Sequence, residues 1–301
     1  MRWQPCLSAI ILGHLLFSLP AIAQDAIGDK ITSFFSSGEY SAEETYVGNA
    51  GVRRGTRAVI DFDESDSLLR FILTPRTKIG VLRIGAEWER FEFGFPKNTP
   101  LPGTLQSIGL VLGLDTQFSD SILVRIEGQP GAYNTGFGHV SDDFNMPFIA
   151  GGTYIYNADL QLVVGVSVDI ERKYPVIPAA GFRWKAARQW VVNAVLPAPR
   201  IEFEWNKDLT LYAGATVKET NFRVDDDFGD RHGKPQLNHA VLTYSEVRAG
   251  PGVEWKITPI LSLTAEAGYQ PYRTFDFYRT DTRFHQDSSA PFGMVTLHGA
   301  F

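Results

Sequence analysis

The sequence has one cysteine, Cys6, and no long apolar run beyond its first 23 residues. A single cysteine excludes a disulfide framework. Without about 18 consecutive apolar residues, the rest of the chain has no candidate for a transmembrane helix. The formal charge of −6 also excludes the basic face that a nucleic-acid partner requires, so we expect no such partner.

The first 23 residues have the three parts of a secretory signal peptide. Arg2 gives a positive start, residues 9–19 form an apolar core, and Ala21-Ile22-Ala23 is a small-x-small cleavage site. The core is too short to span a membrane. We therefore expect export by a cleaved signal peptide (1–23). Cys6 leaves with it, so the mature chain has no thiol chemistry.

Strict alternation of apolar and polar residues is the dominant pattern in the rest of the chain. It runs through 160–170, 209–218, 247–257 and 259–270. This period of two is typical of strands with two unlike faces. Segments of about 9 to 11 residues match the strands that cross a membrane in a barrel.

Short and long connections alternate between these segments. The short ones are 74–76, 118–120, 157–159, 187–188, 206–208 and 258–259, and the long ones are 95–104, 130–146, 171–178, 219–240 and 271–290. A compact Pro-rich connection at 196–199 takes one of the long positions. This asymmetry is typical of outer-membrane barrels, which have short periplasmic turns and longer external loops.

We therefore predict an all-β fold, a transmembrane antiparallel up-and-down β-barrel of about 12–14 strands over 54–301. The expected strands are 54–62, 67–74, 77–94, 104–118, 121–129, 147–156, 160–171, 178–186, 189–196, 200–206, 209–219, 241–257, 259–270 and 291–301. The count falls to twelve if the first two do not span.

Two segments fit this pattern less well. In 77–94 the apolar phase changes, because Leu82, Ile84 and Trp88 lie on one face and Phe91 and Phe93 on the other. Either a β-bulge near 89–90 restores the phase or the strand leaves the membrane there.

Residues 24–53 are predicted to form an N-terminal segment outside the barrel. Ile27, Ile31, Phe34 and Phe35 have helical spacing. The segment is either a short amphipathic helix, which plugs the lumen or lies in the periplasm, or it is disordered.

Charged residues on the face opposite the apolar one carry both signs. Facing lipid, each would cost about 2–4 kcal/mol at the midplane, so we expect them to face the lumen. They include Arg83, Glu87, Arg125, Glu127, Asp169, Arg183, Arg200, Glu202, Glu204, Arg248, Glu254 and Glu266. Balanced charge leaves two interpretations: a salt-bridged interior, or a wet and weakly selective one.

Aromatic residues gather near the short turns, where a ring can lie between hydrocarbon and water. We predict a membrane-interface girdle of Trp184, Trp190, Trp205, Trp255, Phe118, Tyr156 and Phe301. Val295, Leu297 and Phe301 also resemble the C-terminal assembly signal of bacterial outer-membrane proteins, although Gly299 replaces the usual bulky residue. The expected partners are outer-membrane lipids, the barrel-assembly machinery and periplasmic chaperones.

The segment 178–212 resembles a family of bacterial outer-membrane β-barrels that is known only as a domain of unknown function. The residues that carry the resemblance are Pro178, Gly181, Phe182, Trp184, Trp190, the run Leu196-Pro197-Ala198-Pro199-Arg200-Ile201 and the run Leu209-Thr210-Leu211-Tyr212, with Pro130-Gly131 and Asp143-Phe144 upstream. The resemblance covers about 80–270. It implies the barrel and the outer-membrane location, and it implies no activity.

Motifs of enzymes are few. The sequence has no nucleophile elbow, zinc-binding His-Glu-x-x-His or phosphate-binding loop. His139 and Ser141 lie beside Asp142 and Asp143 in a long connection, which lacks the rigid shell that catalysis needs. The acidic run 225–230 lacks the ligand spacing of a calcium loop, so we interpret it as solvated charge. We expect no enzyme activity, cofactor or metal.

The leading functional hypothesis is a passive channel or transport-related, porin-like barrel for an unknown solute, because 12 to 14 strands enclose more space than side chains fill. The alternative is a plugged barrel with a structural or surface-interaction role. A membrane-embedded hydrolase is a third hypothesis. Conductance across planar bilayers distinguishes the first two.

Overall fold

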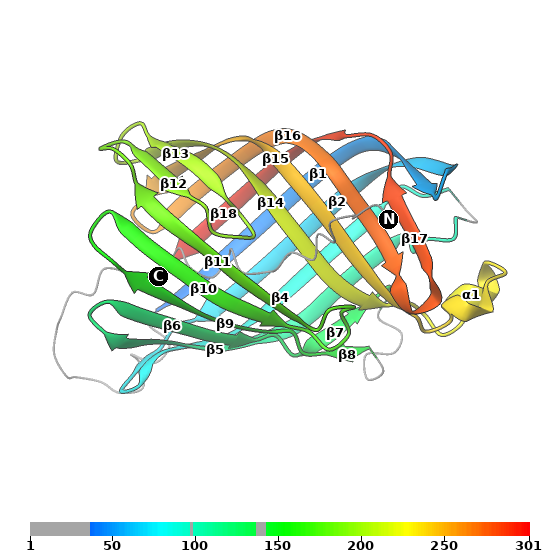
Figure 1. The fold of residues 1–301 in the computed structure, drawn as a ribbon, viewed down its shortest axis with the longest axis horizontal. Coiled ribbons are helices and arrows are strands. Elements are labelled where there is room, and N and C mark those ends of the chain that lie inside the picture. The colour runs from blue at the N-terminus through cyan, green and yellow to red at the C-terminus, as the bar shows by residue number, and fades with distance from the viewer. Residues whose placement is uncertain (1–36, 97–98, 137–142) are drawn as a thin grey trace, which may run out of the picture.

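The chain forms a closed antiparallel β-barrel (Figure 1), so the predicted fold class is confirmed. The computed structural model describes residues 37–96, 99–136 and 143–301. The predicted signal peptide and the helical spacing at 27–35 lie outside these residues. No helix within them is long and apolar enough to cross a membrane.

The strands follow one another around the barrel in chain order. Their bounds are β1 Gly38–Arg54, β2 Arg57–Leu73, β3 Arg76–Thr77, β4 Gly80–Phe93, β5 Thr104–Ser119, β6 Ile122–Gly128, β7 Gly131–Asn134, β8 Phe144–Asn145, β9 Phe148–Ile155, β10 Leu160–Val168, β11 Val176–Lys185, β12 Trp190–Asn193, β13 Arg200–Glu204, β14 Leu209–Arg223, β15 Val241–Thr258, β16 Leu261–Phe277, β17 Thr282–Gln286 and β18 Ala290–Ala300. The short helices are α1 Phe228–Arg231, η3 Pro235–Leu237 and η4 Tyr278–Thr280.

Fourteen spanning strands make up the wall, because four of these segments continue a neighbour. β6 continues as β7 and β8 as β9, and both breaks contain a proline, Pro130 and Pro147, which has no N–H for the ladder. β17 continues as β18, and β3 extends β2. β1 pairs with β18 from Glu39↔Ala300 to Val47↔Phe292 and closes the barrel.

The prediction for residues 24–53 is wrong from residue 38 onward, because 38–54 is the closing strand β1. The expected strands 54–62 and 67–74 are two parts of one strand, β2. Between them, Glu64 and Asp66 are buried while Asp63 and Ser65 face outward. Because residues 63–66 are polar on both faces, this middle part of β2 lacks the apolar row by which the other strands were identified.

Of the two alternatives for 77–94, the β-bulge near 89–90 is wrong, whereas the exit of the strand from the membrane stays a prediction. β4 pairs with β2 without a register shift, from Glu64↔Phe93 to Leu73↔Ile84. Phe91 and Phe93 are buried on the inner face, whereas Ile84 is exposed on the outer face. The phase therefore does not change along β4, and its two apolar rows belong to opposite faces.

The strands differ greatly in length, so the barrel narrows along its axis. β12 and β13 have 4 and 5 residues, whereas β15 has 18. Beyond β12 and β13, toward the long loops, β7 pairs with β5 and with β14. The contact with β14 is a single parallel bridge, Asn134↔Arg223. The long-loop half is thus a ring of nine strands, β1, β2, β4, β5, β7, β14, β15, β16 and β17. Rings of about eight strands are narrow enough for side chains to fill.

The predicted girdle residues lie near the short turns, at the end opposite α1 (Figure 1), and all seven are 47–74% exposed. Phe301 stacks on Phe71 with ring centroids 6.0 Å apart and exchanges two backbone hydrogen bonds with Gly38. Val295 is exposed as well. The roles of these residues at a membrane interface and in assembly stay predictions.

Gly299 supplies a test of the β1–β18 closure. The Tyr40 ring lies over it, and a Cβ at Gly299 would be 2.3 Å from that ring. We expect Gly299→Ala to lower the free energy of unfolding by about 1–3 kcal/mol, because Tyr40 must move. The measurement is urea unfolding of the barrel in lipid vesicles. Gly293→Ala, on the same strand with nothing within 4 Å, is the control. Equal losses in both variants would contradict this explanation.

Candidate functional site

An aromatic plug fills the nine-strand ring. Each of the nine strands contributes at least one buried side chain to it, and four more come from the connections. Its members are Val52, Phe62, Phe91, Phe93, Leu105, Tyr133, Phe222, Leu242, Tyr244, Phe275, Phe277, Phe284, Leu101, Val224, Phe228 and Leu237. The plug was not predicted from the sequence, because only the outer face was expected to be apolar.

Ring contacts cross the barrel. Phe93 of β4 meets Phe275 of β16 edge to face, with centroids 5.1 Å apart, and Phe91 lies 4.9 Å from Tyr244 of β15. β4 is not a neighbour of β15 or β16 in the wall. These contacts therefore join opposite sides, and each adds about 0.5–1.5 kcal/mol beyond the burial of area.

An ion layer lies directly against the plug. It consists of Glu64, Asp66, Glu89, Lys218, Glu246, Arg248 and Arg273. Arg273 Nη1 lies 2.6 Å from Glu64 Oε2, and the guanidinium packs over the Phe62 ring at 4.0 Å. Tyr244 donates a hydrogen bond to the same Glu64 oxygen at 2.8 Å. The plug and the ion layer thus form one continuous block.

Lys218 links three strands across the interior. Its Nζ lies 2.9 Å from Asp66 Oδ2 on β2 and 2.6 Å from Glu89 Oε1 on β4, although Lys218 itself is on β14. Arg248 of β15 also reaches Asp66, at 3.2 Å. Such buried charges depend on their partners, because removing one leaves an uncompensated charge in the interior.

An inner cavity of about 340 Å³ lies on the other side of the ion layer, toward the short turns. Lys218 and Arg248 line it at the ion layer, and Glu254, Thr264 and His298 line it farther along their strands. Tyr212 projects over Gly252 and donates a hydrogen bond to Glu266 at 2.9 Å. The barrel is therefore filled at one end, and at the other it is hollow, with charged side chains in the lining of the cavity.

Most of the charges predicted to face the lumen form two ion-pair networks. In the first, Glu127 accepts from Arg83 Nε at 3.0 Å and from Arg70 Nη2 at 2.6 Å, and Arg70 also lies 3.3 Å from Glu87. Arg125 pairs with Asp115 in the same region. Arg70 and Asp115 lie on the same inner face, and the pairing of these charges could not be predicted from the sequence.

The second network lies on β11 to β15. Glu202 accepts from Arg183 Nη2 at 3.1 Å and from Arg200 Nε at 2.8 Å, and Glu254 is 3.7 Å from Arg200. Glu204 pairs with Lys185 at 3.0 Å. Arg248 belongs to the ion layer, and Glu266 contacts Tyr212.

Asp169 stands apart from these networks. It accepts hydrogen bonds from Asn145 and Asn221, at 3.0 and 2.6 Å. Asn221 is three residues from Lys218 on β14, so the two lie on opposite faces of that strand. The structure thus does not bring Asp169 together with the other predicted lumen charges.

The residues considered for catalysis and metal binding form no site in the described part of the chain. His139, Ser141 and Asp142 lie outside it, and Asp143 accepts a hydrogen bond from Asn134. Among the described residues, no group of His, Cys, Asp and Glu is arranged to hold a metal. In the acidic run, Asp225 and Asp227 both pair with Arg231.

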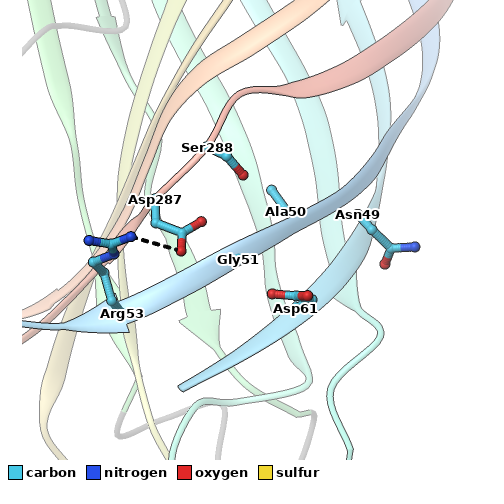
Figure 2. Close-up of a pocket in the computed structure, with 7 residues that line it drawn as sticks. All are labelled: Asn49, Ala50, Gly51, Arg53, Asp61, Asp287 and Ser288. Atoms are coloured by element: carbon cyan, nitrogen blue, oxygen red, sulfur yellow. Dashed lines mark hydrogen bonds and ion pairs between the residues drawn. The ribbon is translucent and has the colours of Figure 1, made fainter. Parts of the chain in front are cut away.

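A second hollow, of about 450 Å³, lies at the rim of the long-loop end (Figure 2). It forms where β1 shifts register between Val47 and Ala50 and where β17 breaks from β18. Arg53 and Asp287 line it and form an ion pair at 3.2 Å, and Asp61 lines it from the neighbouring strand (Figure 2). Because this pair is partly exposed, it contributes little to stability, and its two charges neutralise each other.

Comparisons with known proteins agree with this architecture. The chain is similar in structure to an outer-membrane channel from Pseudomonas putida F1, with a TM-score of 0.50 and 7% identity over 91% of this chain and 100% of that one. It is also similar to the Pseudomonas putida toluene transporter TodX, with a TM-score of 0.48 and 10% identity over 88% and 90%. At 7% identity, the likeness to the channel shows a common fold alone.

No curated protein matches the sequence. The profile of one protein family, described as a domain of unknown function (DUF6268), matches residues 126–293. This range covers more than half of the 301 residues and includes the strands β9 to β17. The chain therefore belongs to the DUF6268 family.

Proposed function

We propose that the protein is a channel-type barrel of the outer membrane that rests in a closed state. The observation that carries the proposal is the division of the lumen. Side chains fill the nine-strand half, while the fourteen-strand half keeps a cavity of about 340 Å³ that charged side chains help to line. The plug is the barrier, and the inner cavity is the vestibule behind it.

The outer surface supports a membrane location. Leu110, Leu112, Leu162 and Val164 are exposed large apolar side chains on the wall. In water, such a surface would be an aggregation hazard, whereas lipid accommodates it. With the predicted signal peptide and girdle, this surface supports an orientation with the short turns and the inner cavity on the periplasmic side and the long loops outside.

The hollow interior favours a channel over a purely structural barrel. A barrel that only anchors a surface gains nothing from a charged cavity, because each inward charge must find a partner. The fold shared with the Pseudomonas putida channel is consistent with this proposal.

Conductance across planar bilayers tests the closed channel. We expect the wild-type protein to give no stable current steps, because the plug leaves no continuous path. Phe93→Ala combined with Phe275→Ala removes a ring pair that crosses the lumen and should produce steps. Phe93→Val with Phe275→Val is the milder variant if the first pair fails to fold. Folding is checked by the heat-dependent shift in gel mobility.

Phe118→Ala with Phe144→Ala is the matched control, because both rings are exposed on the outside. This control should give no stable current steps. Steady conduction by the wild type would show that the lumen is not closed at rest. Folded plug variants that stay silent would contradict the channel and favour the alternative below.

A plugged barrel with a structural or surface-interaction role is the second candidate. One observation favours it: Arg273 and Glu64 are both fully buried, and their ion pair joins β16 to β2 directly beside the plug. A permanent plug of this kind should contribute strongly to stability, whereas a barrier that opens readily should contribute less.

Removing one member of this pair measures how firmly the plug is held. We expect Arg273→Met to lower the free energy of unfolding by about 3–5 kcal/mol, because it leaves Glu64 buried without a cation. Adding Glu64→Gln should recover most of the loss. The readout is the urea midpoint in vesicles. Lys185→Met removes an exposed pair and should cost less than about 1 kcal/mol. Similar losses in both would show that the buried pair has no special role.

A further inference from the structure

The inner cavity has an unbalanced charge, although equal numbers of cations and carboxylates line it. The four cations are Arg70, Arg200, Lys218 and Arg248, and the four carboxylates are Glu39, Glu43, Glu254 and Glu266. Each cation also has partners just outside the lining. The charge that a solute meets therefore depends on these contacts.

Every lining cation lies within 4 Å of two carboxylates. Arg70 contacts Glu87 and Glu127, and Arg200 contacts Glu202 and Glu254. Lys218 contacts Asp66 and Glu89, and Arg248 contacts Asp66 and Glu246. Four cations thus share seven carboxylates, and none of the four has positive charge to spare for an anionic solute.

The carboxylates on the β15–β16 side of the cavity are less neutralised. Glu266 accepts a hydrogen bond from Tyr212 Oη at 2.9 Å, and within the described residues no cation lies within 4 Å of it. Glu254 is 3.7 Å from Arg200, which lies closer to Glu202, at 2.8 Å.

Cations farther from the cavity do not remove the excess. Arg83, Arg183 and Arg273 contact Glu127, Glu202 and Glu64 respectively. Among the described residues, these three bring the cations to seven, and Lys256, two residues from Glu254 on the same face of β15, brings them to eight. Glu39, Glu43, Glu64 and Glu266 bring the carboxylates to eleven. Inside a low-dielectric wall, such an excess of fixed charge raises the local concentration of counter-ions by about 10- to 1,000-fold.

We propose that the inner cavity admits and concentrates small cations, including organic ammonium ions, and excludes small anions. This deepens the proposed function, since it names the class of solute that the vestibule accepts. It also resolves the two interpretations of the mixed inner charge: the cations are held in salt bridges, and the remaining carboxylates set the selectivity of the water-accessible space.

A reactive thiol in the cavity tests the proposal without any need for conduction. Thr264→Cys places one there, beside Glu254 in register and two residues from Glu266, in a chain whose Cys6 is replaced with Ser. The thiolate attacks a methanethiosulfonate reagent, forms a mixed disulfide and releases methanesulfinate. A trimethylammonium-bearing reagent is compared with a sulfonate-bearing one of similar size.

We expect the cationic reagent to react about tenfold faster than the anionic one, after each rate is divided by that for free cysteine in solution. Glu254→Gln with Glu266→Gln should bring the ratio toward one. Glu44→Gln is the matched control, because Glu44 is exposed on the outer face, where it accepts hydrogen bonds from Ser65 and Ser67. It should leave the ratio unchanged.

Equal rates, or a faster anionic reagent, would overturn the cation preference. A thiol that reacts with neither reagent in the folded protein would show that the cavity is sealed from water, and would overturn both the preference and the vestibule. Silent plug variants in bilayers would instead overturn the channel and leave the ratio of reaction rates as an independent result.

Discussion

The structure depends on one geometric constraint: a closed barrel must pair the edges of all its strands, and here it does so at two circumferences. Near the short turns, fourteen strands complete the circle. Where β12 and β13 end, the bridge between β7 and β14 lets nine strands complete it. Because the diameter of a barrel grows with strand number, the narrower ring can be filled by side chains and the wider one cannot. The plug and the cavity are both consequences of this change.

The ion layer lies where the nine-strand ring meets the fourteen-strand part of the barrel. Charges there are too deep for bulk water, yet they face a cavity on one side, and this explains why they are paired across the lumen instead of along one strand. Lys218 and Asp66 are 152 residues apart in sequence, and Arg273 and Glu64 are 209 residues apart. Each pair therefore ties distant parts of the wall together, and the same pairing removes positive charge from the cavity while carboxylates remain.

The sequence predicts the parts of the wall that have lipid on one side and polar groups on the other. β10, β14, β15 and β16 were identified in this way, because their apolar rows are unbroken. β1 and the middle of β2 were missed, since Glu44 and Ser65 face outward while Thr45 and Glu64 are buried. The apolar row of Phe91 and Phe93 was interpreted as a change of phase, although it is the inner face of β4. Alternation shows that the two faces of a strand differ but not which of them is inside. The partners of each charge follow from closure, which no local pattern encodes.

The composition of the plug also has a consequence for how the molecule is made. Apart from Tyr133 of β7 and Phe228 of α1, its rings come from β2 and β4 near the beginning of the chain and from β14 to β17 near the end. None of the contacts between Phe93 and Phe275 or between Glu64 and Arg273 exists until the last third of the polypeptide has joined the sheet. Contacts of such long range make assembly slow, because the entropy of ordering the intervening chain is lost before they form. The barrier across the lumen is therefore among the last features to form. Until then, the phenylalanines on the inner face of the incomplete barrel stay exposed.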